Sequence, residues 1–282
     1  MKAMELSHEQ VLKILPDREI TSHKGDFGRI LLLCGSRGYT GAAALAAMGA
    51  LRCGAGLVYL GVPEGIYGIE AVKLTEPIVF PLPEEGGILS EESLPRIHAL
   101  LPKMDAVLIG PGLGCNAGSF AVVKAVLECF SKPVVLDADG INLLQGHIDL
   151  LRGRTGPTIL TPHDGEYVRF GGCLDGGRVA QAEAFASDTH TILLLKGHNS
   201  IITDGVNTYI NPTGNPGMAV GGSGDVLAGM ITALLGQGIH PLLSAACGAW
   251  LHGAAGDICA KELGQYGMLP TDMLQVLPRL LK

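Results

Sequence analysis

The sequence is poor in aromatic residues and in charge. Phenylalanine, tryptophan and tyrosine make up 5% of the 282 residues, and 27 acidic against 20 basic side chains give a net charge of −7. The lysines and arginines form no cluster. Because proteins that bind nucleic acid usually carry a basic patch, we expect no nucleic-acid partner.

The cysteines show no spacing that indicates a disulfide framework or a zinc site. None forms a Cys-x-x-Cys pair or a cysteine–histidine metal pattern, and their number is odd. This usage is typical of small buried side chains in a reducing compartment. The seven residues are Cys34, Cys53, Cys115, Cys129, Cys173, Cys247 and Cys259.

Long apolar runs are also missing. The stretch Met1–Glu9 lacks the apolar segment of a signal peptide, and the most apolar region, residues 42–60, is interrupted by Arg52 and several glycines. No uncharged run approaches the roughly 18 to 20 residues that a membrane helix needs. We therefore expect a cytoplasmic protein with no membrane partner.

Glycine, in contrast, is abundant: 41 of 282 residues, about 15% and about twice the usual share. Hydrophobic residues make up 47%, which allows a large core and excludes a disordered chain. Glycine without a three-residue repeat indicates tight turns and places where the backbone approaches a ligand closely.

Short apolar runs alternate with longer helical patterns along the chain. Near-continuous apolarity in the short runs predicts parallel strands covered on both faces, and Asp204-Gly205 predicts a hairpin between residues 200–203 and 207–210. The fold class is therefore α/β, a doubly wound, mostly parallel sheet flanked by helices with a small antiparallel hairpin. No linker or repeat divides the chain, so we expect residues 1–282 to form one domain. The predicted strands are Arg29–Leu33, Leu57–Leu60, Ala106–Ile109, Pro133–Leu136 and Ile192–Leu195, and the predicted helices are Thr40–Cys53, Ser90–Leu101, Ser119–Phe130, Arg178–Ser187, Gly224–Leu235, Leu242–Ala260 and Met273–Leu281.

Glycine-rich turns follow two of the predicted strands, and ligands bind beyond the carboxyl ends of strands in such sheets. The segment Gly35–Ala43 is either a plain turn or a backbone surface for a ligand, and it lacks the Gly-x-Gly-x-x-Gly spacing of a dinucleotide site. In Gly110–Gly114, three glycines and a proline form a rigid surface without side chains. We interpret it as ligand-lining, with a structural turn as the alternative.

Acidic side chains and a histidine follow other strands. Asp137 and Asp139 either hold a cation or a ribose, or cap the next helix. In Thr161–Glu166 the proline fixes a turn, and His163 and Glu166 share one face if a helix begins there. His163 beside a carboxylate at a strand exit favours a functional role over a structural one.

The strongest signal is the segment Asn215–Gly229, in which glycines lead into an apolar helix that carries Asp225 near its start. Free N–H groups at a helix N-terminus bind anions, and the helix dipole adds to this. A carboxylate held there can accept a proton from an attacking hydroxyl. Lys196–Ser200 adds a cation and a tight backbone turn for a nucleotide phosphate, or else a surface lysine at a hairpin.

These motifs together resemble the ribokinase-like superfamily, and within it the ADP-dependent NAD(P)H-hydrate dehydratases, from about His23 to the C-terminus. The resemblance implies repair of the S-form of hydrated NADH or NADPH. ADP would phosphorylate the ring hydroxyl and phosphate would then leave, giving NAD(P)H, AMP and phosphate. It also implies Mg²⁺, with ATP as an alternative co-substrate, and a homo-oligomer, namely a tetramer. Since 282 residues leave no room for a fused epimerase half, we expect a functional link to a separate NAD(P)H-hydrate epimerase.

The resemblance also implies roles for individual residues. Asp225 would be the general base, and Glu166 would organise magnesium through water. The chain departs from the family at Val220, where threonine is usual, and at Asp164, where proline is common. The implied anion hole is Gly221, Gly222, Ser223 and Gly224; the substrate contacts are Ala43, Gly112, Gly114, His163 and Asp225; the nucleotide contacts are Lys196, Gly197, His198, Asn199, Ser200 and Gly224.

Other functions compete with this interpretation. A small-molecule kinase of the same superfamily, of the hydroxymethylpyrimidine or thiazole-alcohol type, would use the same helix start but release a phosphorylated product. A catalytically silent nucleotide-binding protein is disfavoured by the intact Asp225. A Rossmann dehydrogenase is disfavoured because no Gly-x-Gly-x-x-Gly follows the first strand.

Overall fold

The computed structural model describes residues 3–282 and is built around one nine-stranded sheet with the order β11-β10-β9-β8-β7-β6-β1-β2-β3. The strands from β3 to β9 in this order pair in parallel, whereas β10 pairs antiparallel with both β9 and β11. The predicted parallel sheet with an antiparallel hairpin is thus confirmed. The strands are β1 (Arg29–Leu33), β2 (Leu57–Pro63), β3 (Ile78–Leu82), β6 (Ala106–Ile109), β7 (Val134–Leu136), β8 (Thr158–Leu160), β9 (Ile192–Leu195), β10 (Ser200–Thr203) and β11 (Thr208–Asn211).

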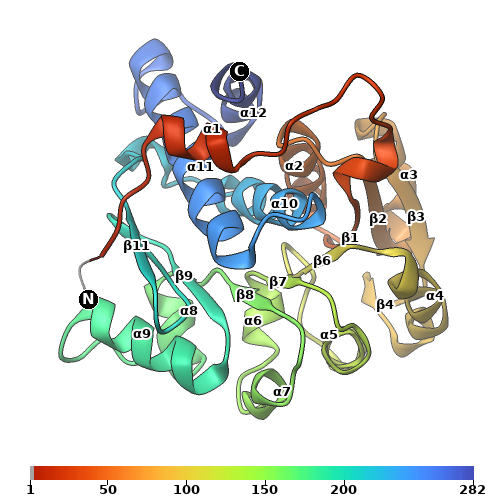
Figure 1. Ribbon diagram of the computed structural model, residues 1–282. Helices are drawn as coiled ribbons and strands as arrows, with labels where there is room; N and C mark the ends of the chain where they lie inside the picture. Colours follow the sequence, from red (N-terminus) through yellow and green to blue (C-terminus); the bar gives the residue numbers. More distant parts are fainter. Residues whose placement is uncertain (1–2) are drawn as a thin grey trace.

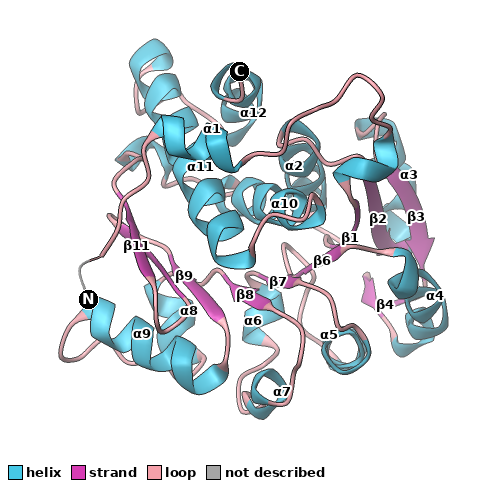
Figure 2. Cartoon of the chain, in the orientation of Figure 1, coloured by secondary structure: helices cyan, strands magenta, loops and turns pink. Residues whose placement is uncertain are grey.

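Helices cover both faces of this sheet (Figures 1 and 2). The strand pleat divides the core between them: Ile30 and Leu32 of β1 point to one helix layer, and Leu31 and Leu33 point to the other. One layer consists of α1 (His8–Ile14), α2 (Thr40–Arg52), α3 (Glu64–Lys73), α10 (Ser223–Gly236), α11 (Pro241–Leu263) and α12 (Pro270–Leu280). The other consists of α4 (Leu94–Leu100), α5 (Ala117–Cys129), α6 (Asp139–Asn142), α7 (Asp149–Arg152), α8 (Asp164–Arg169) and α9 (Arg178–Thr189).

Some segments differ from the sequence-based expectation. The predicted helix Ser90–Leu101 is a shorter α4 between two 3₁₀ turns. Pro95 has no N–H to bond the Glu91 carbonyl, which separates α4 from the first turn, and Pro102 lies in the second. Strand β3 contains Pro81 and was not predicted. The proline is tolerated because β3 is an edge strand, where a missing backbone N–H removes no hydrogen bond between two central strands. Helices α1 and α3 and the small hairpin of β4 (Glu84–Glu85) and β5 (Ile88–Leu89) were also not predicted, whereas β8 is the strand that was expected before Thr161.

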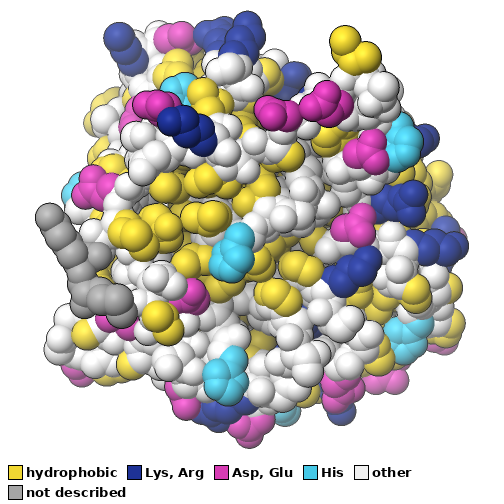
Figure 3. All heavy atoms as spheres, in the orientation of Figure 1, with side chains coloured by type: hydrophobic (Ala, Val, Ile, Leu, Met, Phe, Trp, Pro, Cys, Tyr) yellow, Lys and Arg dark blue, Asp and Glu magenta, His cyan; other side chains and the backbone are white. Residues whose placement is uncertain are grey.

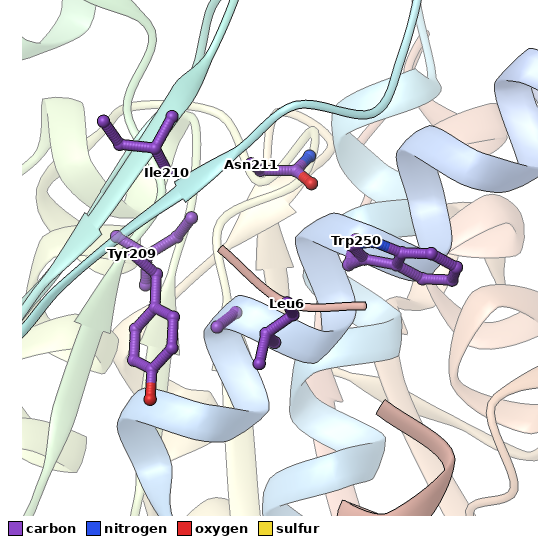
Figure 4. A pocket seen from close by; sticks show the side chains of 7 residues that line it. Leu6, Tyr209, Ile210, Asn211 and Trp250 are labelled. Carbon is purple, nitrogen blue, oxygen red and sulfur yellow. The ribbon is translucent and has the colours of Figure 1, made fainter. Parts of the chain in front are cut away.

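The segment before α1, residues 3–7, lies beside β11, the edge strand on the other side of the sheet from β3. Met4 pairs with Tyr209 of β11, and the ring of His8 stacks on Trp250 of α11 with centroids 5.2 Å apart. Leu6 lies between β11 and α11 and helps to line a hollow of about 10 Å³, which has room for one water molecule at most (Figure 4). Apolar side chains gather over α10 and α11 on this side of the molecule (Figure 3). Within residues 3–282, no helix combines the length and apolarity that a membrane crossing requires.

Two glycines let α2 and α10 approach closely. A Cβ atom added at Gly229 of α10 would overlap the carbonyl oxygen of Ala46, and one added at Gly49 of α2 would overlap that of Val226. The two helix backbones are therefore in direct contact. This contact sets how far the start of α10 reaches beyond the sheet.

We predict that Gly229→Ala lowers the free energy of unfolding by about 1–3 kcal/mol, because overlap with Ala46 outweighs the better helix propensity of alanine. Gly68→Ala is the matched control, since Gly68 is exposed in α3 and its added Cβ would meet open space. The control should raise the free energy of unfolding by up to about 1 kcal/mol. Urea denaturation measures both, and equal effects of the two substitutions would contradict the close helix contact.

Candidate active site

The side chains that the sequence singled out meet at the carboxyl edge of the sheet. Gly110, Asp137, Thr161 and Lys196 each follow directly on a neighbouring parallel strand, β6, β7, β8 and β9. The chain first runs from β1 to β2 and β3 and then returns to β6 on the other side of β1. The strand order therefore reverses beside these residues, where open α/β sheets bind ligands.

An ion pair between the buried Asp137 and the largely buried Lys196 occupies the centre of this edge. The Lys196 Nζ atom lies 2.9 Å from Asp137 Oδ1, which also accepts a 2.7 Å hydrogen bond from the Thr161 hydroxyl. The Glu166 carboxylate lies 3.9 Å from the same ammonium. Burial alone would lower the pKa of Lys196, but the two carboxylates outweigh it and raise the pKa above its usual value, so the lysine is a fixed cation. Asp137 therefore anchors Lys196 instead of acting only as a helix cap.

Asp225 lies beside this pair, in the first turn of α10, and is half-buried. Burial and the nearby charge of Asp137 raise its pKa to about 6, while Lys196 acts in the opposite direction. Gly224 lies directly beside this pair, since a Cβ atom added there would stand 3.4 Å from Lys196 Nζ and 3.9 Å from Asp137 Oδ2. A carboxylate with such a pKa is suited to accept a proton near neutral pH.

The start of α10 also has the features of an anion site. Its N-cap residue, Gly222, has φ +97° and, within the described chain, no side chain caps the helix. Since no side chain of the described residues caps it, the start of α10 can offer amides to a ligand, although the Ser223 N–H donates to the Val220 carbonyl at 3.3 Å. Gly221 is exposed, and Val220 is 40% exposed and offers no side-chain hydrogen bond where threonine would.

His163 and Glu166 cap α8 reciprocally. The His163 Nδ1 atom accepts hydrogen bonds from the N–H groups of Gly165 and Glu166, and the Glu166 Oε2 atom accepts a 2.9 Å bond from the His163 N–H. The structure thus brings these two side chains together, as expected from their spacing. More than half of the His163 side chain is exposed, so the ring can cap α8 and still face a ligand.

The Lys196–Ser200 loop is tied to α8. The Lys196 N–H donates to the Pro162 carbonyl at 2.8 Å, and the Ser200 hydroxyl donates to the Gly197 carbonyl at 3.0 Å. Gly197, His198 and Asn199 are exposed. The loop is thus anchored at its two ends, and its middle residues are open to solvent.

The Gly110–Gly114 turn forms another side of the site. Gly112 lies against Tyr39 and Ala42 at the start of α2, and the Gly114 N–H donates to Asp139 Oδ2 at 2.9 Å. Asp139 therefore holds this turn, which favours the structural alternative for that residue. Ala43, also at the start of α2, is fully buried, so in this conformation it supports the wall of the site instead of lining it.

One buried group near the site was not predicted from the sequence. His252 of α11 lies 3.4 Å from the Ser223 hydroxyl, and burial lowers its pKa to about 4. The ring is therefore neutral at physiological pH and packs behind the start of α10. A lone histidine in an apolar helix carries no local signal of this contact, because only the packing of α11 on α10 creates it.

A divalent cation at this site would depend on few protein ligands. Among residues 3–282, no three His, Cys, Asp or Glu side chains converge as a metal cluster. Asp137 and Glu166 offer carboxylate oxygens at the edge, which suits Mg²⁺, an ion that binds one or two carboxylates together with waters and phosphates. The donor set thus fits a magnesium ion held mainly by a nucleotide.

A separate hollow of about 400 Å³ lies beside the amino ends of β6 and β7, away from the carboxyl ends that carry the site. Its residues include none that the sequence singled out. The Lys132 amine in its wall is bound to the Met104 carbonyl and to Asp105. The chemistry therefore concentrates at the carboxyl edge.

Known proteins are similar to this chain in sequence and in fold. The family model described as NAD(P)H-hydrate dehydratase matches residues 30–279. The chain belongs to this family. Among its curated relatives, the bifunctional NAD(P)H-hydrate repair enzyme Nnr of Moorella thermoacetica is 46% identical over 275 residues, covering 95% of this chain. The match spans 52% of that relative, so the chain corresponds to about half the length of such proteins.

Solved structures agree with this family membership. The ADP/ATP-dependent NAD(P)H-hydrate dehydratase of Bacillus subtilis, co-crystallised with ATP and Mg²⁺, has a TM-score of 0.85 at 31% identity, covering 99% of this chain and 98% of that one. Ribokinase of Thermotoga maritima has a TM-score of 0.56 at 14% identity, covering 89% of this chain and 99% of that one. The ribokinase-like fold of this dehydratase family member is thereby confirmed.

For this dehydratase family member we predict that Asp137→Asn lowers the free energy of unfolding by about 3 kcal/mol, the lower end for a broken buried pair, because Lys196 would lose its neutralising partner. Glu9→Gln is the control, since it removes an exposed pair with Lys13 and should change the free energy by less than about 1 kcal/mol. Urea denaturation measures both. Similar losses for the two variants would contradict the central role of the buried pair.

Proposed function

We propose that this chain catalyses the ADP-dependent dehydration of the S-form of hydrated NADH and NADPH. The main support for this proposal is the position of the Asp225 carboxylate. It is half-buried in the first turn of α10, whose start no described side chain caps, and it lies near the ion pair of Lys196 and Asp137. A general base, an amide anion site and a cation are the groups that phosphoryl transfer to a hydroxyl requires.

In the proposed reaction, Asp225 accepts the proton of the ring hydroxyl as its oxygen attacks the terminal phosphorus of ADP. The bond between that phosphorus and the bridging oxygen breaks, and AMP leaves. The amides of Gly221, Gly222, Ser223 and Gly224 bind the oxygens of the transferring group. The carbon–oxygen bond of the phosphorylated ring then breaks while the neighbouring ring carbon gives up a proton to the departing phosphate, and the new carbon–carbon double bond restores the dihydronicotinamide.

The remaining site residues have supporting roles in this proposal. Lys196 and the loop to Ser200 bind the adenosine phosphate, and the turn with Gly112 and Gly114, together with His163, contacts the hydrated nicotinamide. Magnesium, held through Glu166 and water, would supply charge neutralisation on the phosphates. Ala43 would contribute only if the start of α2 shifted, because it is fully buried here.

The relatives support the wider setting of this activity. Those in Moorella thermoacetica and Escherichia coli are named bifunctional NAD(P)H-hydrate repair enzymes, and the Bacillus subtilis structure is described as ADP/ATP-dependent. We propose ADP as the co-substrate, with ATP as the alternative. We also propose a homotetramer and a functional link to a separate NAD(P)H-hydrate epimerase.

The direct test supplies hydrated NADH or NADPH with ADP or ATP and follows the dihydronicotinamide absorbance. We expect the absorbance to recover, with one AMP and one phosphate formed per molecule repaired when ADP is used. A phosphorylated nucleotide that accumulates without recovery of absorbance would instead identify a kinase of the same fold.

We predict that Asp225→Asn reduces kcat by roughly 10²- to 10⁴-fold, because the amide cannot accept the proton. ADP binding, measured by titration calorimetry, should be retained. Asp149→Asn is the control, since this aspartate on α7 is exposed and outside the site. Unchanged turnover in Asp225→Asn would reject the base assignment.

We further predict that kcat/KM rises tenfold per pH unit on the acid side and levels off near pH 6. The raised pKa of Asp225, about 6, means that the carboxyl is protonated and inactive below this value and ionised above it. The residual activity of Asp225→Asn should lack this inflection. A profile of the wild-type enzyme that is flat through this pH range would contradict the assignment.

A further inference from the structure

Arg178, the first residue of α9, lies directly beneath the Lys196–Ser200 loop. Its Nη2 atom donates to the Lys196 carbonyl at 2.6 Å and lies 3.4 Å from the Leu195 carbonyl. A Cβ atom at Gly197 would lie 2.7 Å from the same nitrogen. The loop main chain therefore rests on the guanidinium, and glycine at position 197 permits the contact.

Asp164 fixes the orientation of this guanidinium. Its Oδ1 atom accepts a 3.0 Å bond from Arg178 Nε and a 2.7 Å bond from Nη2. About a quarter of the Arg178 side chain is exposed and half of that of Asp164. Asp164 begins α8, directly after His163, so the pair connects the two segments assigned above to substrate and nucleotide.

The backbone and side chain of Lys196 are held by three different partners, of which Arg178 is one. Its N–H is bound by the Pro162 carbonyl, its amine by Asp137 at 2.9 Å, and its carbonyl by Arg178. Without Arg178, the peptide between Lys196 and Gly197 would be held, among the described residues, only within the loop itself, by the 3.2 Å bond from the Gly197 N–H to the Ser200 hydroxyl. The loop could then rotate relative to α8 and α9. A loop that must order itself on binding loses affinity, whereas a pre-ordered loop does not.

We propose that Arg178, oriented by Asp164, is a positioning residue that holds the Lys196–Ser200 backbone in the conformation that receives the nucleotide phosphate. This inference rests on the proposed function, since it assigns that loop to ADP. Arg178 acts through the loop and does not touch the reacting atoms. The pair also gives a structural role to Asp164, the residue that stands where the resemblance led us to expect proline.

The test compares Arg178→Gln, Arg178→Lys and Asp164→Ala with the wild type in ADP binding by calorimetry and in steady-state dehydration of hydrated NADH. Partners that orient a ligand-binding group typically contribute about 10- to 100-fold in affinity at metal sites, and we expect about a tenfold rise in Kd and KM for ADP in Arg178→Gln. The kcat at saturating ADP should change much less, because Asp225 and the start of α10 are untouched. Arg178→Lys should retain part of the affinity, and Asp164→Ala should show a smaller loss.

Arg152→Gln is the matched control. Arg152 also pairs with two aspartates, Asp149 and Asp188, each at 2.6 Å, but on the surface of α7 and α9. It should leave Kd and kcat unchanged. Thermal unfolding of every variant separates loop positioning from general destabilisation, and the exposed Asp164 allows a test even if Arg178→Gln does not fold.

The outcomes separate this inference from the proposed reaction. An unchanged Kd for ADP in Arg178→Gln or in Asp164→Ala, or an equal effect of Arg152→Gln, would overturn the positioning role. Wild-type protein that binds ADP without repairing hydrated NADH would overturn the reaction alone, and the Kd comparison would still decide the role of Arg178. Wild-type protein that binds no ADP would overturn both.

Discussion

The buried ion pair between Lys196 and Asp137 is the interaction on which the rest of the site depends. It places a permanent cation at the meeting point of β7, β8 and β9, with Thr161 supplying the remaining hydrogen bond. The pair also sets the electrostatic balance at Asp225, because Asp137 raises the pKa of that carboxyl while Lys196 lowers it. A carboxylate that titrates near neutral pH is the result of this balance and of burial.

The position of α10 is the second constraint, and the core provides it. Gly229 and Gly49 allow α10 to lie against α2 with their backbones in contact, and the contact reaches Val226 in the first turn of α10. His252 and Ser223 add a contact between α11 and the same helix start. The proposed anion site is therefore supported from behind by α2 and α11.

Structural and functional roles coincide in several residues of this site. His163 and Glu166 cap α8 and are also the residues proposed to act on substrate and magnesium, and Asp139 holds the Gly110–Gly114 turn. The fold is shared with ribokinase at 14% identity, so the fold alone does not identify the reaction. The chemical groups at the carboxyl edge, together with membership of the NAD(P)H-hydrate dehydratase family, carry the functional proposal.

The sequence by itself determined the elements that depend on residues close together in the chain. Continuous apolar runs specified the central strands such as β1 and β6, and the glycines before Asp225 indicated the anion site, because amide exposure at a helix start depends on neighbouring residues only. Tertiary structure decided what depends on residues distant in sequence: β3 tolerates Pro81 only because it is an edge strand, and Ala43 is buried by packing. The partners of Asp137, Arg178 and His252 lie on other elements, so neither their contacts nor the pKa of Asp225 could be read from spacing along the chain.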